Sequence, residues 1–342
     1  MKKQNDYQIK LTQLQGAKVY AQLAKEVNAA GILRRDYVYY TILTTLTLTA
    51  FFISLFFLYR AQSAVSLVLW SFPFSFFAVQ IGGLMHDAGH GAIFSSVKNN
   101  DLAGRFFGGF VSFGYTSWKK RHNAHHAHPN NEETDDDVID YPFLTFNEER
   151  VLKSKGISKT ILKRQVFLYY LIQPLFAIVM RITFFVTYFQ KYAKRNFVEI
   201  AFYSVGFFAW FILPFILFDF PKALFILVIP SLLSGAYMAN IFAPNHKGMP
   251  IVKRGTKLSF FEEQIATSRD VDSNPILDYI YLGLNFQVEH HLFVNCPRNK
   301  LHLITPYLEK ACRKTGIKFH RVDVIKSNKI ILGELMRLSA TI

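Results

Sequence analysis

YVYYTILTTLTLTAFFISLFFLYRAQSAVSLVLWSFPFSFFAVQIGGLMHDAGH, residues 37–90, is the stretch that decides the fold. It contains two apolar segments without a charged residue, Tyr37–Tyr59 and Ala61–Met85, separated by Arg60. Each is long enough to cross about 30 Å of hydrocarbon at a rise of about 1.5 Å per residue. The short link predicts a helical hairpin in a membrane, followed directly by His86 and His90.

The composition also favours a membrane-embedded domain. Of the 342 residues, 51% are hydrophobic and only 18% are charged, below the roughly 25% usual for soluble domains. The net charge is +15. No basic stripe coincides with a nucleic-acid motif, so we expect no nucleic-acid partner. We expect the positive charge on loops that face an anionic membrane leaflet. The polar start, residues 1–6, predicts no cleavable signal peptide. Only Cys296 and Cys312 occur, which argues against a disulfide framework.

Histidines are clustered along the chain at the spacings of metal ligands. The candidate ligands are His86 and His90; His122, His125 and His126; His246; and His290 and His291, with Gln287 as a weak or indirect ninth position. Residues three or four apart share a helix face, so each cluster predicts one metal-binding face. Eight imidazoles exceed the ligands of one zinc site, and two metal ions are the economical inference. We expect His128, His302 and His320 not to bind metal.

The number of membrane crossings follows from these clusters. Three further apolar segments occur at 166–189, 200–218 and 223–243. If all three crossed the membrane, the second histidine cluster and the later ones would lie on opposite sides. The segment 166–189 carries Arg181 near its middle, and an interfacial helix lets such a side chain snorkel. We therefore predict four spans, at about 37–59, 61–85, 200–218 and 223–243, with 166–189 at the interface.

The prediction is an all-α, multi-pass integral membrane protein. Lysines and arginines before the first span put the N-terminus in the cytosol. Residues 1–36 form a cytosolic N-terminal arm, and one domain covers 37–342. A cytosolic helical cap, residues 86–165 and 244–342, holds the histidine-rich dimetal site on the cytosolic face.

The three clusters HDAGH, HNAHH and QVEHH resemble the histidine boxes of the membrane fatty acid desaturases. Gln287 in the third box is similar to the front-end subgroup, which includes acyl desaturases of the Δ5/Δ6 type and sphingolipid Δ8 enzymes. The chain departs from the family pattern at Val294, where Pro is frequent, and at Asp270, where Asn is common. HDAGH also lacks the Glu of the zinc-protease motif HExxH, which disfavours proteolysis.

The resemblance implies that 37–342 is a desaturase domain. It implies two iron ions (Fe2+/Fe3+) held by the eight histidines, with no catalytic residue beyond the metal centre. It implies that O2 and two electrons introduce a cis double bond into a fatty acyl chain carried by CoA, carrier protein or lipid. No heme motif of the HPGG kind occurs in the chain, so we expect a separate electron donor of the ferredoxin or cytochrome b5 type.

The sequence also predicts hydrogen-bond partners for the candidate ligands and leaves two alternative functions open. Asp87, Asn123 and Glu289 are predicted partners of imidazole N–H groups, and Asp135–Asp137 are predicted to be a solvated acidic loop. A diiron hydroxylase or ketolase of a lipid or hydrocarbon remains an alternative. A non-catalytic membrane metal-binding protein is another, and metal stoichiometry separates it from an enzyme.

Overall fold

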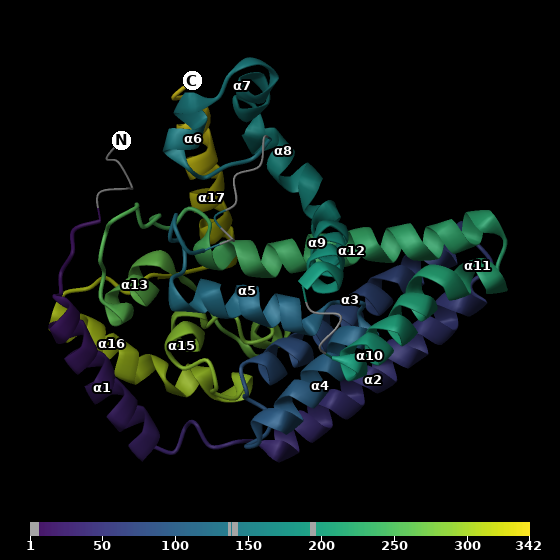
Figure 1. The fold of residues 1–342 in the computed structure, drawn as a ribbon, viewed down its shortest axis with the longest axis horizontal. Coiled ribbons are helices and arrows are strands. Elements are labelled where there is room, and N and C mark those ends of the chain that lie inside the picture. Colours follow the sequence, from purple (N-terminus) through teal and green to yellow (C-terminus); the bar gives the residue numbers. More distant parts are fainter. Residues whose placement is uncertain (1–6, 136–137, 139–142, 192–195) are drawn as a thin grey trace. The chain divides into compact units, whose positions relative to one another are not determined.

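The computed structural model describes residues 7–135, 138, 143–191 and 196–342. The first six residues of the predicted arm, and residues 136–137 and 139–142 of the predicted cap, lie outside them. The described residues are mostly helical (Figure 1), and the chain divides into two compact units. We call Met1–Arg34, Arg121–Leu171 and Ile241–Ile342 the histidine unit, and Arg35–Lys120 and Ile172–Asn240 the hairpin unit.

The helices of the hairpin unit are α2 (Tyr37–Arg60), α3 (Ala64–Gly89), α4 (Val97–Phe110), the short η2 (Gln173–Leu175), α9 (Phe176–Lys191), α10 (Phe197–Phe207), the π-helical turn η4 (Phe208–Ile212) and α11 (Leu213–Leu217). Helices α5 (Tyr115–Ala127), α8 (Gln165–Ile172) and α12 (Phe220–His246) run through the unit boundaries.

The predicted hairpin is confirmed as α2 and α3, which pack against each other (Figure 1). Asp36 caps α2 by accepting from the backbone N–H of Tyr39, and Ser63 forms a capping box with Ser66 at the start of α3. These caps satisfy backbone donors that a helix start leaves open. At the link, Lys222 Nζ donates to the carbonyls of Tyr59 at 2.9 Å and of Ala61 at 2.8 Å. Two carbonyls at this short link therefore have a hydrogen-bond donor within the unit.

Helices α4 and α10 approach so closely that only glycine fits between them. A Cβ atom on Gly206 would lie 1.7 Å from the carbonyl oxygen of Gly109. Small residues at a crossing let two backbones approach in this way, as they do in membrane helix pairs. Trp210 extends the contact, because its indole N–H donates to the carbonyl of Phe110 at 2.6 Å.

Among the described residues, five helical stretches are long and apolar enough to cross a membrane: Tyr37–Arg60, Ala64–Gly89, Gln165–Lys191, Phe197–Leu217 and Phe220–His246. Four of them overlap the predicted spans, although one begins three residues after the start of 61–85 and another ends one residue before the end of 200–218. The fifth contains the segment 166–189, and its assignment to the interface stays a prediction.

The reason for that assignment needs correction, because Arg181 does not snorkel. It is only 7% exposed, and its guanidinium donates to the carbonyl of Val111 at 3.3 Å and to the hydroxyl of Ser231 at 3.1 Å. The guanidinium also lies 5.2 Å from the ring centroid of Trp210, within cation–π range. Since Val111 is the C-cap of α4, the cation also meets the negative end of a helix dipole. The hairpin unit satisfies this charge internally, so Arg181 does not argue against a span.

The histidine unit contains α1 (Gln13–Ala29), α6 (Glu148–Lys153), α7 (Gly156–Leu162), α13 (Phe260–Thr267), α14 (Pro275–Ile280), α15 (Gln287–Leu292), the 3-10 helix η5 (Arg298–Leu303), α16 (Thr305–Thr315) and α17 (Val324–Ser339). Strands β1 (Asp270–Val271) and β2 (Arg321–Val322) pair in parallel. Helix α1 packs on α13 and α16, as Figure 1 shows. The carboxylate of Glu262 accepts from the backbone N–H groups of Lys10 and Leu11, and Tyr20 donates to the carbonyl of Leu292 at 2.8 Å. These contacts anchor the N-terminal segment beside the third histidine box.

Candidate metal centre

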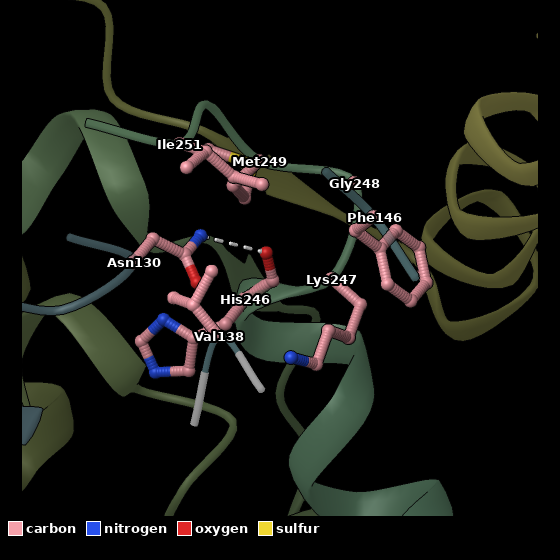
Figure 2. A pocket seen from close by; sticks show the side chains of 8 residues that line it. All are labelled: Asn130, Val138, Phe146, His246, Lys247, Gly248, Met249 and Ile251. Carbon is pink, nitrogen blue, oxygen red and sulfur yellow. Dashed lines mark hydrogen bonds between the residues drawn. The ribbon is translucent and has the colours of Figure 1, made fainter. Parts of the chain in front are cut away.

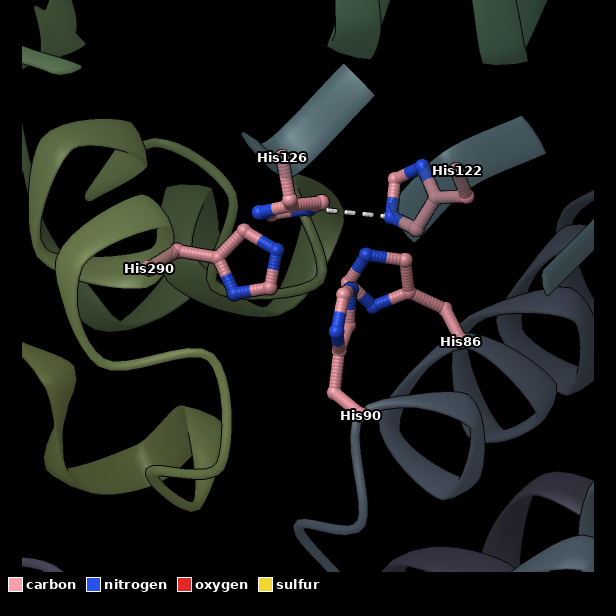
Figure 3. Close-up of side chains that lie close together, drawn as sticks. All are labelled: His86, His90, His122, His126 and His290. Carbon is pink, nitrogen blue, oxygen red and sulfur yellow. Dashed lines mark hydrogen bonds between the residues drawn. The ribbon is translucent and has the colours of Figure 1, made fainter. Parts of the chain in front are cut away.

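His86 and His90 lie in the hairpin unit, at the last turn of α3 and at its C-cap. Their ring centroids are 4.6 Å apart (Figure 3). Asp87 Oδ1 lies 3.3 Å from Nδ1 of His86, and the hydroxyl of Tyr40 donates to Asp87 Oδ2 at 2.8 Å. The predicted role of Asp87 as a partner of an imidazole is therefore confirmed. The i, i+4 spacing brings the two imidazoles together, as the sequence predicts.

Helix α5 carries the second box, and Glu199 anchors its first turn. Thr116 donates to the Glu199 carboxylate from its backbone N–H, at 2.9 Å, and from its hydroxyl. A carboxylate at a helix N-terminus satisfies an open donor and complements the helix dipole.

The three histidines of α5 do not form one face, which corrects the prediction. His122 and His126 face each other, with Nε2 atoms 3.1 Å apart, and His290 of α15 joins them (Figure 3). The candidate ligand atoms of these three side chains lie within 4.8 Å of one another. His125 instead groups with His246 and His291. A helix turns by about 100° per residue, so adjacent histidines point to different sides.

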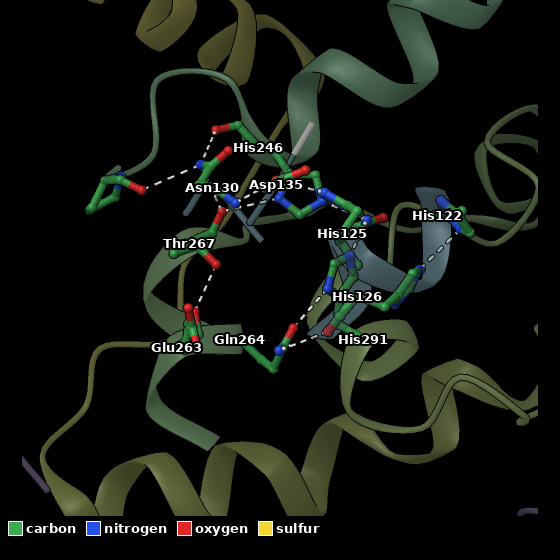
Figure 4. Close-up of polar contacts among 12 residues, drawn as sticks. His122, His125, His126, Asn130, Asp135, His246, Glu263, Gln264, Thr267 and His291 are labelled. Atoms are coloured by element: carbon green, nitrogen blue, oxygen red, sulfur yellow. Dashed lines mark hydrogen bonds and ion pairs between the residues drawn. The ribbon is translucent and has the colours of Figure 1, made fainter. Parts of the chain in front are cut away.

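The second group, His125, His246 and His291, lies entirely in the histidine unit (Figure 4). Its ligand atoms also lie within 4.8 Å of one another, and all three side chains are buried. Each Nδ1 meets an oxygen: Asp135 Oδ2 at 2.8 Å from His125, the Thr267 carbonyl at 3.1 Å from His246, and Gln264 Oε1 at 2.8 Å from His291.

These oxygens determine which nitrogen can bind a metal. A carbonyl and a carboxylate only accept, so Nδ1 of His246 and His125 must donate. Gln264 is oriented by its own Nε2, which donates to the His126 carbonyl at 3.1 Å, and its oxygen therefore faces His291. With every Nδ1 protonated, each Nε2 keeps a lone pair for a metal. Burial, reinforced by neighbouring imidazoles, holds the pKa of His291 well below its usual value and favours this neutral form.

Asp135 contacts a candidate ligand, and its predicted place in a solvated loop is wrong. It was expected in a solvated loop, but it is buried and also accepts from the backbone N–H of Asn130 at 2.7 Å. Asp136 and Asp137 lie outside the described residues. The Asn130 amide in turn donates to the His246 carbonyl at 3.1 Å, at the edge of a small pocket that His246 and Lys247 help to line (Figure 2). The sequence signal for the contact of Asp135 with His125 was its position ten residues after that histidine.

The donor set fits a transition metal bound without carboxylate ligands. Neutral imidazole suits iron, zinc and copper, and most metal-binding histidines donate their other ring N–H to an oxygen, as these do. His128 stands apart, with Nδ1 3.0 Å from Glu263 Oε2 and about half of its side chain exposed. Neither His302 nor His320 falls in either group.

The sequence profile of the fatty acid desaturases matches residues 62–323. The chain belongs to the fatty acid desaturase family. It is 28% identical to the Δ8-fatty-acid desaturase of Euglena gracilis over 257 residues, which are 70% of this chain and 60% of that protein. It is 25% identical to a Δ6-fatty-acid desaturase of Caenorhabditis elegans over 339 residues, 94% of this chain and 74% of the relative. A Δ8-(E)-sphingolipid desaturase of Lachancea kluyveri is 26% identical, covering 94% of this chain and 60% of the relative. The chain thus spans less than two thirds of the length of the Euglena and Lachancea proteins.

In this member of the desaturase family, Gln287 lies within the second histidine group. Its Nε2 is 2.8 Å from Nε2 of His246 and 2.9 Å from Nε2 of His291. Its Oε1 accepts from Asn245 Nδ2 at 3.0 Å. The amide therefore occupies the position of a ligand while its oxygen points to Asn245.

The other predicted partners in the boxes of this desaturase-family chain behave differently. Asn123 is exposed. Glu289 is buried but meets Thr305, whose hydroxyl donates to Glu289 Oε1 at 2.5 Å, and Asp270. Its predicted role as an imidazole partner is therefore wrong. The third box is also not a single metal-binding face, because His290 and His291 belong to different groups.

Asp270, which stands where asparagine is common in the family, supports the third histidine box. Its Oδ1 accepts from the backbone N–H of Val288 at 3.0 Å, and Arg321 lies 3.3 Å from its Oδ2. Burial, and then the charge of Glu289, raises the pKa of Asp270 well above its ordinary value. Asp270 therefore supports the third box through its contacts with the Val288 backbone and Arg321.

Proposed function

We propose that this protein is a fatty acyl desaturase of the front-end type. The observation that carries the proposal is the buried group His125, His246 and His291, whose Nε2 atoms converge while every Nδ1 donates outward. Membership of the desaturase family gives this group its chemistry. Gln287 and the Δ8 and Δ6 desaturases among the relatives support the front-end type.

The proposed cofactor is a pair of iron ions. One ion is assigned to His125, His246 and His291. The other is assigned to His122, His126 and His290, and His86 and His90 stay candidate ligands from the sequence. A bound iron pair would supply the oxidising power by which O2, two electrons and two protons take two hydrogens from adjacent methylenes, leaving a cis alkene and two waters. Iron is chosen over zinc because the reaction is a redox reaction.

The protein itself orients the metal-binding imidazole rings and excludes water from the site. Asp135, Thr267 and Gln264 hold the three rings of the second group in one tautomer. Such oxygens raise the basicity of the ligating nitrogen and fix the ring orientation. An unactivated methylene offers no polar handle, so the double-bond position must be selected by the shape of the acyl site.

The proposed setting is a multi-pass membrane protein with its metal centre on the cytosolic side. We propose four crossings, with 166–189 at the interface, so that all three boxes share one side of the bilayer. The proposed partners are a fatty acyl chain on CoA, carrier protein or lipid, O2, and a separate donor of the ferredoxin or cytochrome b5 type.

The decisive experiment is expression in a host without this activity, followed by fatty-acid profiling and localisation of the double bond. We expect a new cis double bond, lost in His291→Ala and retained in His302→Ala, which removes an exposed histidine outside both groups. Iron content of the purified protein is measured in parallel.

The products distinguish the alternatives. A hydroxylated or oxo product indicates a hydroxylase or ketolase, and one exchangeable zinc without product indicates a metal-binding protein. An unchanged lipid profile from iron-loaded protein supplied with a donor would overturn the desaturase assignment.

A further inference from the structure

We propose that Arg269 is a positioning residue of the second histidine group, and that it fixes His246 by binding the C-terminal end of α12. The inference rests on the proposed metal site and adds to it a side chain that contacts no ligand nitrogen. Arg269 donates to backbone carbonyls on both sides of His246. Its contacts therefore do not use the Nε2 lone pair that His246 would give to a metal.

The side chain of Arg269 joins two carbonyls at the end of α12. This helix ends at His246, so the carbonyls of its last turn have no continuing helix to bind. Both Nε and Nη2 of Arg269 donate to the carbonyl of Pro244, Nε at 2.7 Å. Nη2 also donates to the carbonyl of Lys247 at 2.9 Å. The guanidinium thus connects the residue two places before His246 with the residue directly after it.

The backbone around Arg269 binds the same helix end. The N–H of Arg269 donates to the carbonyl of Asn245 at 2.9 Å, and the Asn130 amide donates to that of His246 at 3.1 Å. Every carbonyl from 244 to 247 therefore has a donor. The carbonyl of Thr267 accepts from Nδ1 of His246 at 3.1 Å (Figure 4). Residues 267–269 consequently bind both the imidazole of His246 and the backbone that carries it.

The guanidinium of Arg269 is a buried charge. Its side chain is 0% exposed, and among the residues that the structure describes no carboxylate pairs with it. Burial lowers the pKa of Arg269 to about 10, so the group is still charged at neutral pH. The carbonyls and the negative end of the α12 dipole stabilise this charge instead. An apolar side chain would fill the same space without the cost of burying a charge, so packing alone does not explain an arginine here.

The shape of the guanidinium suits this task better than an ammonium group. Its donors are fixed in one plane, so binding two carbonyls at once also fixes the distance between them. A lysine would bring the same charge, but on a flexible stem and without the planar fork. Arg269→Lys therefore separates the effect of the charge from that of the fork.

The test is anaerobic titration of the metal-free, full-length protein with Fe2+, followed by Mössbauer spectra of the loaded samples. Arg269→Met removes the guanidinium but keeps an unbranched side chain, and His246→Ala identifies the ion that depends on this ligand. Arg181→Met is the matched control. Arg181 is also a buried guanidinium that donates to the C-cap carbonyl of a helix, that of Val111, but neither Val111 nor its other partner Ser231 adjoins a box histidine.

We expect Arg269→Met to weaken the binding of one ion about 10- to 100-fold, the usual effect of removing a residue that orients a ligand. The affected ion should be the one that His246→Ala removes, and only its quadrupole splitting should change. Arg269→Lys should bind this ion with intermediate affinity. Arg181→Met should lower the melting temperature, as Arg269→Met does, and leave the affinities for both ions unchanged.

Equal weakening of both ions in Arg269→Met would show a general role in folding and overturn the inference. Unchanged binding of the ion that depends on His246 would overturn it as well. Should Arg269→Met fail to fold, Arg269→Lys provides the same comparison, and full affinity in that variant would refute the role of the fork. If the unchanged, correctly folded protein binds no iron, the proposed function itself fails. With an iron-loaded unchanged protein, the other results concern only Arg269.

Discussion

The carboxylate of Asp135 lies 2.8 Å from Nδ1 of His125, and it also accepts the backbone N–H of Asn130. One buried side chain therefore holds both a candidate metal ligand and the loop that follows α5. The interaction joins residues ten positions apart and determines the tautomer of His125.

Removing this carboxylate should weaken metal binding. We expect Asp135→Ala to lower the affinity for iron about 10- to 100-fold, the usual effect of deleting such a partner. Asp135→Asn should recover part of it, since the amide oxygen still accepts from Nδ1–H. Iron titration checks this, with Glu133→Gln, an exposed acid in the same loop, as control. Equal affinities in Asp135→Ala and the control would contradict the role.

The close crossing of α4 and α10 should not tolerate a methyl group. Gly206→Ala would place Cβ 1.7 Å from the Gly109 carbonyl oxygen, and the helices must separate. We expect the free energy of unfolding to fall by about 1–3 kcal/mol, as for other overpacked sites. Gly333→Ala, whose Cβ would have nothing within 4 Å, should leave stability unchanged or raise it by up to about 1 kcal/mol. Thermal unfolding in detergent measures both, and similar melting temperatures would refute the prediction.

The segment 165–191 should not cross the membrane if the proposed topology holds. Lys163 and Lys191 flank it and are exposed, so a cysteine at either position can be labelled. Both Lys163→Cys and Lys191→Cys should react with a membrane-impermeant maleimide added on the cytosolic side. The buried Cys296 and Cys312, replaced by serine, remove the background. Labelling of the two positions from opposite sides would establish a fifth crossing.

Asp270→Asn should be tolerated and should flatten the dependence of stability on pH. Because the folded pKa of Asp270 is raised above its ordinary 3.8, the folded protein binds the proton that the unfolded chain releases. The stabilisation is complete below pH 3.8 and is lost as the pH rises through the folded pKa. An asparagine has no proton to lose. Melting temperatures measured across this pH range test the dependence of stability on pH. The control variant Asp272→Asn, which changes an exposed neighbour, should keep the pH dependence of the unchanged protein.

The long apolar helices, the hairpin and the clustering of the histidines could be predicted from the sequence. Apolar length and helical spacing are local properties, so the stretch from Tyr37 to His90 already contains the two helices and the first histidine pair. The pair at i and i+4 met as expected because only one helix is involved.

Only the tertiary structure decided how the later histidines are divided and what supports them. His125 and His126 are neighbours in the chain, but their directions differ by about 100°, so that His126 meets His290 whereas His125 meets His246 and His291. The partners Gln264 and Thr267 were found only through contacts between residues distant in the chain, and folding turned Asp135 from a loop residue into a buried partner of His125. Arg181 also acquired its partners by folding. Spacing determines which side chains share a helix face, whereas packing determines what that face meets.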